Sequence, residues 1–273
     1  MGFLDHDGPV VYAHRGGNER HPENSMASFA DAVAQGFTYL ETDVRLSADG
    51  VLVALHDSHL ERVSDGRGAV AEHTAAALVR MRLRHPDGSL SDERIPLLDD
   101  LVAAFPAAKF NIDAKEPATV GPLGDALERL DLLERSCVGA FSDERLNALR
   151  RRFGAALCTA LGPREVARVR AAGFGLPAGS VAGRVAQVPV HAPVPVPLPA
   201  PLPRSVRIPV VDRFFLAACR RLGVPVHVWT VNDAAQMEAL LDRGVHGFMT
   251  DRPSVAADVL RRRGAWPPRP TPT

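Results

Sequence analysis

The sequence alternates short runs of apolar and β-branched residues with longer runs whose apolar residues recur at helical spacing. If residues 39–56 count as one unit, there are eight β/α units, which is the number that closes a parallel barrel. We therefore predict an α/β fold, a (β/α)8 TIM barrel; an open doubly wound sheet is the alternative. The expected strands are 10–14, 39–46 with a hairpin-like continuation at 51–56, 110–115, 137–141, 156–161, 187–190, 224–231 and 247–250. The expected helices are 25–35, 97–105, 119–130, 143–152, 164–171, 212–222, 234–243 and 254–263.

Two stretches interrupt this rhythm. Residues 57–95 are polar with turn signals, and we expect a small insertion after the second strand, over the barrel mouth. Residues 189–209 carry proline at alternate positions, which favours an extended polyproline-type path in a long loop; a docking motif for a partner domain is the alternative. We expect 1–265 to form a single domain and the proline-rich 266–273 a disordered tail.

Composition excludes several classes of protein. The chain has 273 residues and 46% hydrophobic residues, enough for a substantial core. Lys+Arg and Asp+Glu are both 32, so the charge indicates no nucleic-acid partner. The N-terminus lacks the pattern of a signal peptide, and no apolar run is long enough to span a membrane. Cys137, Cys158 and Cys219 are widely spaced, which suggests a reducing compartment, and we expect a cytoplasmic protein.

Acidic residues are spaced to face the barrel interior. Residues i and i+2 of a strand point to the same side, so Glu41 and Asp43 project together, as do Asp113 and Lys115 on a later strand. Three converging carboxylates need a cation or must take up protons. Oxygen ligands suit Ca²⁺ or Mg²⁺ better than zinc, so we predict a divalent metal site. The alternative is that the acids only pair with nearby arginine and lysine side chains.

Two histidines end apolar runs close to these acids. The unperturbed pKa of histidine lies near neutrality, so His14 and His56 could divide general acid and base work at a phosphorus centre. Arg15 can hold phosphoryl oxygens in a bidentate way, and Lys115 can add a point charge. Hydrogen-bonded core histidines are the alternative. Together the residues indicate metal-assisted cleavage of a phosphate ester. Asp251, before Pro253, is expected to cap the last helix.

An ordered set of motifs resembles the glycerophosphodiester phosphodiesterase family and covers nearly the whole chain. The motifs are Val11-Tyr-Ala-His-Arg-Gly-Gly, Pro22-Glu-Asn-Ser, Glu41-Thr-Asp-Val, His56-Asp, Ile95-Pro-Leu-Leu-Asp-Asp, Asn111-Ile-Asp-Ala-Lys, Val228-Trp-Thr-Val-Asn and Gly244-Val-His-Gly-Phe-Met-Thr-Asp-Arg-Pro. The resemblance implies an enzyme of lipid metabolism that splits glycerophosphodiesters into sn-glycerol 3-phosphate and an alcohol, with Ca²⁺ or Mg²⁺, through a cyclic phosphate.

The resemblance also implies roles for individual residues. His14 and His56 would be the acid/base pair, Arg15 and Lys115 would hold the phosphate, and Trp229 would form an apolar wall for the substrate. The implied metal ligands are Glu41, Asp43 and Asp113. The third ligand position often carries Glu in this family, so the shorter Asp113 would lengthen or lose one metal contact, or bring in a bridging water.

Two other functions stay open. An apolar groove beside Trp229 and the proline-rich loop would favour lysophospholipids as substrates. A decayed barrel would only bind a phosphate ligand.

Overall fold

The computed structural model describes residues 2–195 and 205–267. Its main sheet has nine strands; one of them, β3 (Leu52–Ala54), pairs antiparallel with the end of β2 (Tyr39–Leu46), and the other eight run parallel. The parallel order is β8–β7–β6–β2–β1–β13–β12–β9. A bridge between Ala160 and Val185 joins the two ends of this order and closes the barrel. The remaining parallel strands are β1 (Val10–His14), β6 (Lys109–Ala114), β7 (Ser136–Gly139), β8 (Cys158–Thr159), β9 (Ala186–Pro189), β12 (Val226–Trp229) and β13 (Gly247–Thr250).

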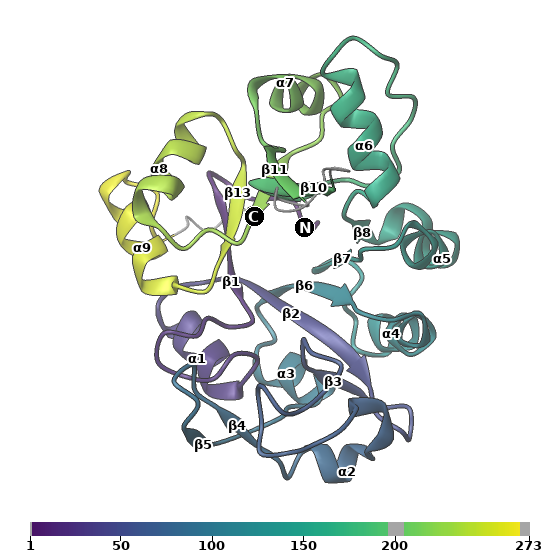
Figure 1. The fold of residues 1–273 in the computed structure, drawn as a ribbon, viewed down its shortest axis with the longest axis vertical. Coiled ribbons are helices and arrows are strands. Elements are labelled where there is room, and N and C mark those ends of the chain that lie inside the picture. The colour runs from purple at the N-terminus through teal and green to yellow at the C-terminus, as the bar shows by residue number, and fades with distance from the viewer. Residues whose placement is uncertain (1, 196–204, 268–273) are drawn as a thin grey trace.

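Helices surround this barrel, as Figure 1 shows. The α/β prediction is therefore confirmed as a (β/α)8 barrel, and the elements lie close to the ranges expected from the sequence. The longer helices are α1 (Met26–Ala34), α3 (Leu98–Ala104), α4 (Val120–Arg129), α5 (Asp143–Phe153), α6 (Pro163–Ala172), α7 (Arg213–Arg221), α8 (Ala234–Asp242) and α9 (Pro253–Arg262). None of the helices described is long and apolar enough to cross a membrane.

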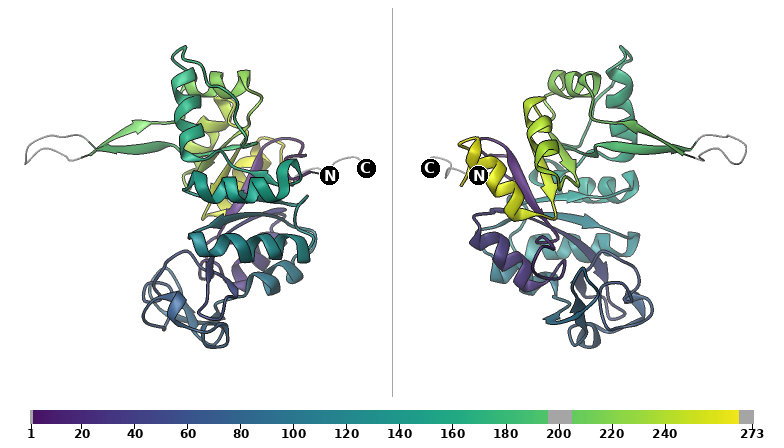
Figure 2. Two further views of the ribbon diagram at one scale, coloured as in Figure 1. Left: turned by 90° about the vertical axis from the view of Figure 1, so that its right-hand side faces the viewer. Right: turned by 60° about the vertical axis from the view of Figure 1, so that its left-hand side comes forward.

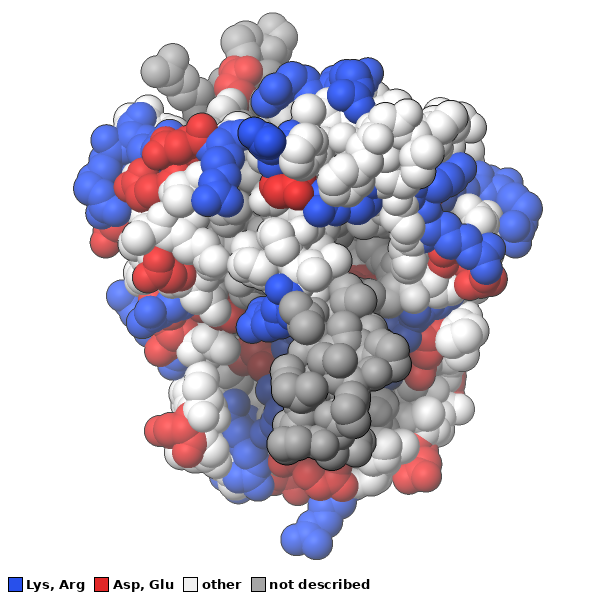
Figure 3. Space-filling view, turned by 45° about the horizontal axis from the view of Figure 1, so that its top comes forward, with Lys and Arg blue, Asp and Glu red and all other residues white. Residues whose placement is uncertain are grey.

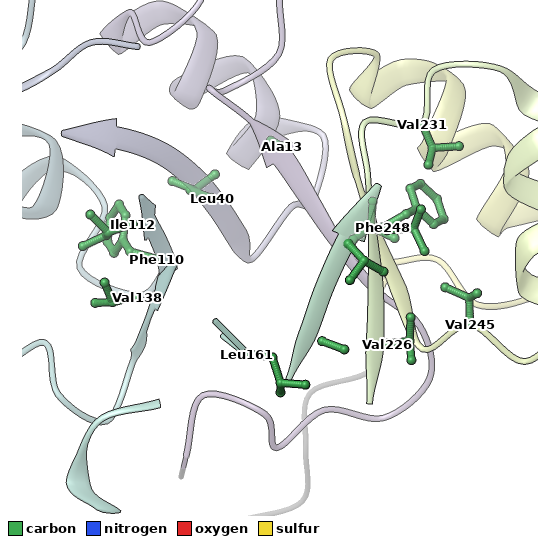
Figure 4. Close-up of a cluster of buried hydrophobic side chains, with 14 of the residues drawn as sticks. Ala13, Leu40, Phe110, Ile112, Val138, Leu161, Val226, Val231, Val245 and Phe248 are labelled. Carbon is green, nitrogen blue, oxygen red and sulfur yellow. The ribbon is translucent and has the colours of Figure 1, made fainter. Parts of the chain in front are cut away.

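The alternation of side chains along each strand builds two apolar regions. Along β1, Val11 and Ala13 join the large core between strands and helices, part of which Figure 4 shows. Tyr12 belongs instead to a second cluster inside the barrel, which also contains Phe3 and Tyr39. Because the register is fixed by these buried residues, the polar residues further along the same strands face the barrel interior.

The amino ends of the strands are closed by the N-terminal segment. Lys109 at the start of β6 donates hydrogen bonds to the backbone carbonyls of Gly2, Phe3 and Asp5 at 3.0, 3.2 and 2.9 Å. The hydroxyl of Tyr39 donates to the carbonyl of Phe3 at 2.6 Å. This end of the barrel is therefore filled by side chains, which leaves the carboxyl ends of the strands for a cavity.

Residues 57–95 form a small unit with short elements of their own. They contain the 3₁₀ turn η1 (Val70–Glu72), the helix α2 (Ala75–Leu78) and an antiparallel pair of strands, β4 (Arg82–Arg84) and β5 (Leu90–Arg94). A separate hydrophobic cluster supports them, and it includes Leu60, Leu78 and Leu83. In Figure 1 this unit lies beside α1 and α3, next to β2 and β3.

The proline-rich segment differs from its prediction. It contains an antiparallel pair of strands, β10 (His191–Pro195) and β11 (Ser205–Pro209), which projects from the barrel in Figure 2. Alternate residues of a strand turn their backbone nitrogens to the same side, so prolines at alternate positions leave the intervening N–H groups free for a partner strand. The prolines within residues 196–204, for which an extended path was also predicted, lie outside the described residues.

The first residue of the proline-rich C-terminal tail packs against the barrel. Trp266, which we expected in the disordered tail, packs on Phe37 with a centroid distance of 4.8 Å. Its indole nitrogen donates to the carbonyl of Gln35 at 3.2 Å. Residues 268–273 of that tail lie outside the described residues. Figure 3 shows cationic and anionic side chains interspersed over one face of the molecule, in keeping with the balanced charge.

Candidate active site

All eight residues that the sequence singles out line one cavity at the carboxyl ends of the barrel strands. The cavity has a volume of about 420 Å³. Because parallel strands present their carboxyl ends at one side of a barrel, residues distant in sequence meet there. The eight residues are His14, Arg15, Glu41, Asp43, His56, Asp113, Lys115 and Trp229.

The ring of His14, at the end of β1, is held between two carboxylates. Its Nδ1 lies 2.5 Å from Oδ1 of Asp251, and its Nε2 lies 3.7 Å from Oε2 of Glu41. Burial lowers the pKa of His14, but Glu41 and the hydrogen bond with Asp251 outweigh it, so its pKa is raised from the ordinary value. A proton on Nδ1, donated to Asp251, leaves Nε2 for chemistry in the cavity.

The expectation that Asp251 caps the last helix is wrong. The N-cap of α9 is Arg252, which makes no capping hydrogen bond with its side chain. Asp251 instead directly follows β13, which pairs with β1 so that Ala13 lies opposite Thr250. This pairing of the first and last parallel strands of the chain places Asp251 beside His14. A polar residue directly after a strand was the available signal, and the neighbouring proline directed the interpretation elsewhere.

The second histidine, His56, has a similar partner from the adjacent residue. Its Nδ1 lies 2.6 Å from Oδ1 of Asp57. Arg45 donates from Nε to the carbonyl of His56 at 2.8 Å, which fixes the backbone of this loop. Burial lowers the pKa of His56 below its ordinary value; Asp57 and Asp43 oppose this effect. The environments of the two histidines thus move their pKa values in opposite directions.

Two cationic side chains hold the predicted acids. Lys115 Nζ lies 2.7 Å from Oδ1 of Asp43 and 2.6 Å from Oδ2 of Asp113. Arg15 Nε lies 2.9 Å from Oδ2 of Asp43, and the backbone nitrogen of Arg15 donates to Oε2 of Glu41 at 3.1 Å. Burial opposes ionisation of Asp43, but Lys115 and Arg15 lower its pKa. Asp43 and Asp113 therefore pair with nearby cations in this structure, whereas Glu41 contacts the backbone of Arg15 and the ring of His14.

Two carboxylate oxygens in the cluster nevertheless accept no hydrogen bond. Oδ2 of Asp43, despite the nearby Arg15, and Oδ1 of Asp113 are buried and accept no hydrogen bond. Burial and the neighbouring Asp43 raise the pKa of Glu41 to about 7. Burial also raises the pKa of Asp113. Buried carboxylates that cannot all ionise side by side have the donor chemistry that suits a hard divalent cation.

The arrangement in this structure is not that of a complete metal site. Within residues 2–195 and 205–267, no three His, Cys, Asp or Glu side chains are grouped to hold a metal ion. Lys115 Nζ lies between Asp43 and Asp113, where it contacts both. A cation bound by these acids would compete with that ammonium group.

The loop after β1 requires glycine at one position in particular. Arg15 and Gly16 have φ of 53° and 78°. A Cβ on Gly16 would lie 2.3 Å from Oγ of Ser28 and 2.8 Å from the nitrogen of Phe29. A side chain there would therefore push the loop off α1 and displace Arg15 from the cavity.

The rest of the cavity lining is mostly apolar. Trp229 packs edge-on against Phe141 with a centroid distance of 5.6 Å, and the exposed fraction of Phe141 is 66%. Trp229 lines the cavity, where the sequence predicted it. Phe141 comes from the loop after β7, and nothing in the sequence distinguishes it from a surface residue. The other apolar lining residues include Leu161, Pro163, Val166, Val188 and Pro189.

Comparison with known proteins places the chain among phosphodiesterases. The pattern of the "Glycerophosphoryl diester phosphodiesterase family" matches residues 14–255. A relative from Mycobacterium tuberculosis, "Probable glycerophosphodiester phosphodiesterase 2", is 34% identical over 265 residues, which are 97% of this chain and 95% of that protein. A "Glycerophosphodiester phosphodiesterase" from Caldanaerobacter subterraneus is 26% identical over 93% of this chain and 99% of the relative.

Solved structures have the same fold at lower identity. The glycerophosphoryl diester phosphodiesterase domain of a Mycobacterium tuberculosis protein has a TM-score of 0.75 and 24% identity, over 93% of this chain and 100% of that one. A phosphodiesterase from Oleispira antarctica in complex with the product sn-glycerol-3-phosphate has a TM-score of 0.72 and 20% identity, over 93% and 97% of the two chains. Because the family pattern spans most of the sequence and the barrel agrees with it, the chain belongs to the glycerophosphoryl diester phosphodiesterase family, a family of phosphoric diester hydrolases.

Proposed function

We propose that this enzyme hydrolyses glycerophosphodiesters to sn-glycerol 3-phosphate and an alcohol by two-histidine acid/base catalysis. The observation that carries the proposal is the pair of histidines in one cavity, each with Nδ1 against a carboxylate. That arrangement leaves the Nε2 atoms of His14 and His56 to give and take protons. The opposite directions of their pKa shifts suit a division into acid and base.

In the first step we propose that His56 accepts the proton of the glycerol hydroxyl next to the phosphate. The hydroxyl oxygen attacks phosphorus, and His14 protonates the leaving alcohol, which gives a cyclic phosphate. In the second step the roles reverse: water loses a proton to His14, its oxygen attacks phosphorus, and the ring oxygen leaves with a proton from His56. Arg15 and Lys115 hold the phosphoryl oxygens in both steps.

We also propose that the reaction needs a divalent metal, as is general in this family. Glu41, Asp43 and Asp113 would hold Ca²⁺ or Mg²⁺, which when bound supplies positive charge beside the phosphoryl oxygens. The buried carboxylate oxygens without hydrogen-bond partners support this assignment.

The test is turnover of glycerophosphocholine and glycerophosphoethanolamine by purified protein with Ca²⁺, Mg²⁺ or EDTA. We expect turnover that EDTA abolishes and that His14→Ala and His56→Ala reduce at least about a hundredfold, since general acid–base catalysis contributes roughly 10²–10⁴-fold. His85→Ala, in the turn between β4 and β5, is the matched control and should keep wild-type activity. Substrate affinity without turnover would instead support a binding protein on this barrel.

The apolar wall favours a second candidate, hydrolysis of lysophospholipids at the same site. Phe141 is largely exposed at the rim and would contact an acyl chain that extends from the cavity. Phe141→Ala should lower kcat/KM for lysophosphatidylcholine by about tenfold, the effect of roughly 1.4 kcal/mol of lost apolar contact, with little change for glycerophosphocholine. Equal effects on both substrates would remove the reason for this candidate.

Two further expectations remain proposals. Residues 57–95 would act as an insertion at the barrel mouth within a single domain of residues 1–265, and the separate hydrophobic cluster of 57–95 supports this view. The protein would be cytoplasmic, which fits Cys137, Cys158 and Cys219 being free and buried.

A further inference from the structure

Arg62, in the 57–95 segment, makes two pairs of contacts with carboxylates. Its Nε and Nη2 donate to Oδ2 and Oδ1 of Asp57 at 2.5 and 2.9 Å. Its Nη1 and Nη2 donate to Oε2 and Oε1 of Glu23 at 3.0 and 2.8 Å. A guanidinium that binds two carboxylates in this bidentate way fixes both the separation and the orientation of the two acids.

Glu23 continues the network to Arg15, a second residue that lines the cavity. Its Oε1 also accepts a hydrogen bond from Nη1 of Arg15 at 2.9 Å. The contacts therefore run from His56 through Asp57, Arg62 and Glu23 to Arg15. They join the loop after β3, which carries one proposed acid/base histidine, to the loop after β1, which carries the proposed phosphate clamp.

We propose that Arg62 is a positioning residue, which holds Asp57 so that Nδ1–H of His56 stays directed at that carboxylate and Nε2 of His56 stays directed into the cavity. The inference rests on the proposed function of His56. Arg62 lines no part of the cavity, so its action is through Asp57 rather than on the substrate. Its carboxylate partners are both on loops, where backbone structure alone does not fix a side chain.

The exposed fractions of the three side chains indicate that Arg62 acts on the geometry of His56 more than on the stability of the fold. The side chain of Arg62 is 51% exposed, whereas those of Asp57 and Glu23 are 25% and 15% exposed. Because Arg62 itself lies at the surface, its removal leaves no cavity in the core, and Glu23 keeps its hydrogen bond with Arg15. Loss of Arg62 should therefore leave the fold intact and act mainly on the geometry of His56, where a shift of about 1 Å can cost roughly a hundredfold in rate.

The test uses the full chain, glycerophosphocholine and three variants. Arg62→Ala should lower kcat by about 10- to 100-fold, with KM changed less than about twofold, because the phosphate clamp remains. Arg62→Lys should recover part of the loss, since an ammonium keeps the charge but not the bidentate geometry. The matched control is Arg82→Ala, which removes the ion pair of Arg82 with Asp65 (3.2 Å) in the same segment and should leave kcat unchanged.

A second measurement does not depend on turnover. In ¹⁵N NMR spectra of the imidazoles, His56 of the wild type should show its proton on Nδ1, and Arg62→Ala should shift this signal toward a mixture of tautomers, whereas Arg82→Ala should not. A change in the His56 signal in a protein that does not hydrolyse glycerophosphodiesters would support the positioning role and refute the proposed function. A wild-type kcat and an unchanged His56 signal in Arg62→Ala would overturn the inference.

Discussion

Replacing Asp251 with asparagine tests the interaction that orients His14. In the wild type, Oδ1 of Asp251 accepts from Nδ1 of His14 at 2.5 Å, and Oδ2 accepts from Nδ2 of Asn232 at 2.8 Å. Oδ1 of Asn232 is already engaged by the backbone nitrogen of Asp251 at 2.9 Å and by the hydroxyl of Thr250 at 3.1 Å. Asn232 therefore presents only a donor to the carboxylate.

The side-chain NH₂ group of Asn232 therefore determines the orientation of an asparagine side chain at position 251. The new side chain has to turn its oxygen toward Asn232 and its NH₂ group toward His14. Two donors would then meet unless His14 loses the proton on Nδ1, which places its proton on Nε2, the nitrogen that faces the cavity. The variant therefore removes a charge-assisted hydrogen bond and also favours the unsuitable tautomer for a proton acceptor.

Hydrogen bonds to charged groups contribute about 1.5–3 kcal/mol, and about 1.4 kcal/mol corresponds to a factor of ten. Asp251→Asn should thus lower kcat/KM for glycerophosphocholine by about 10- to 150-fold, with the tautomer change as an added loss. Steady-state kinetics at neutral pH is the assay, with Asp258→Asn on the exposed surface of α9 as the control. An activity of Asp251→Asn within twofold of the wild type, in a folded protein, would refute the reasoning.

Two further predictions concern the metal and the core. Asp113→Asn removes one of the buried carboxylates, so binding of Ca²⁺ or Mg²⁺, measured by calorimetry, should weaken by roughly tenfold or more; unchanged affinity would exclude Asp113 as a ligand. Burial lowers the pKa of His227 to about 3, so the unfolded chain binds a proton that the folded protein does not. Its contribution to stability is present above the unfolded value of 6.5 and is lost as the pH falls from 6.5 toward 3, by about 2 kcal/mol at pH 5. Urea unfolding of the wild type and of His227→Asn should show a steeper fall in the wild type below pH 6.5, and parallel curves would contradict this assignment.

Local patterns in the sequence were sufficient for the barrel and for much of the cavity. The periods of two and of about 3.6 residues are set by neighbouring residues along the chain, so strands such as β1 and helices such as α1 lie close to their predicted ranges. The same local rule places Glu41 and Asp43 on one side of β2. Because parallel strands expose their carboxyl ends together, these acids could be expected to lie near Asp113 without knowledge of the structure.

Contacts between distant segments depended on the tertiary structure. Asp251 lies 237 positions from His14, and only the pairing of β1 with β13 brings the two together. The partnership of Arg62 with Glu23 likewise requires that 57–95 pack beside the loop after β1. For the proline-rich segment, the spacing indicated an extended backbone, but only a partner strand turns that backbone into the β10–β11 pair. The order of the strands and helices and the chemical types at the strand ends could be predicted from the sequence, because both are local properties. The pairing of β1 with β13 decided that Asp251 orients His14, because the distance between these two segments is contained in no local pattern.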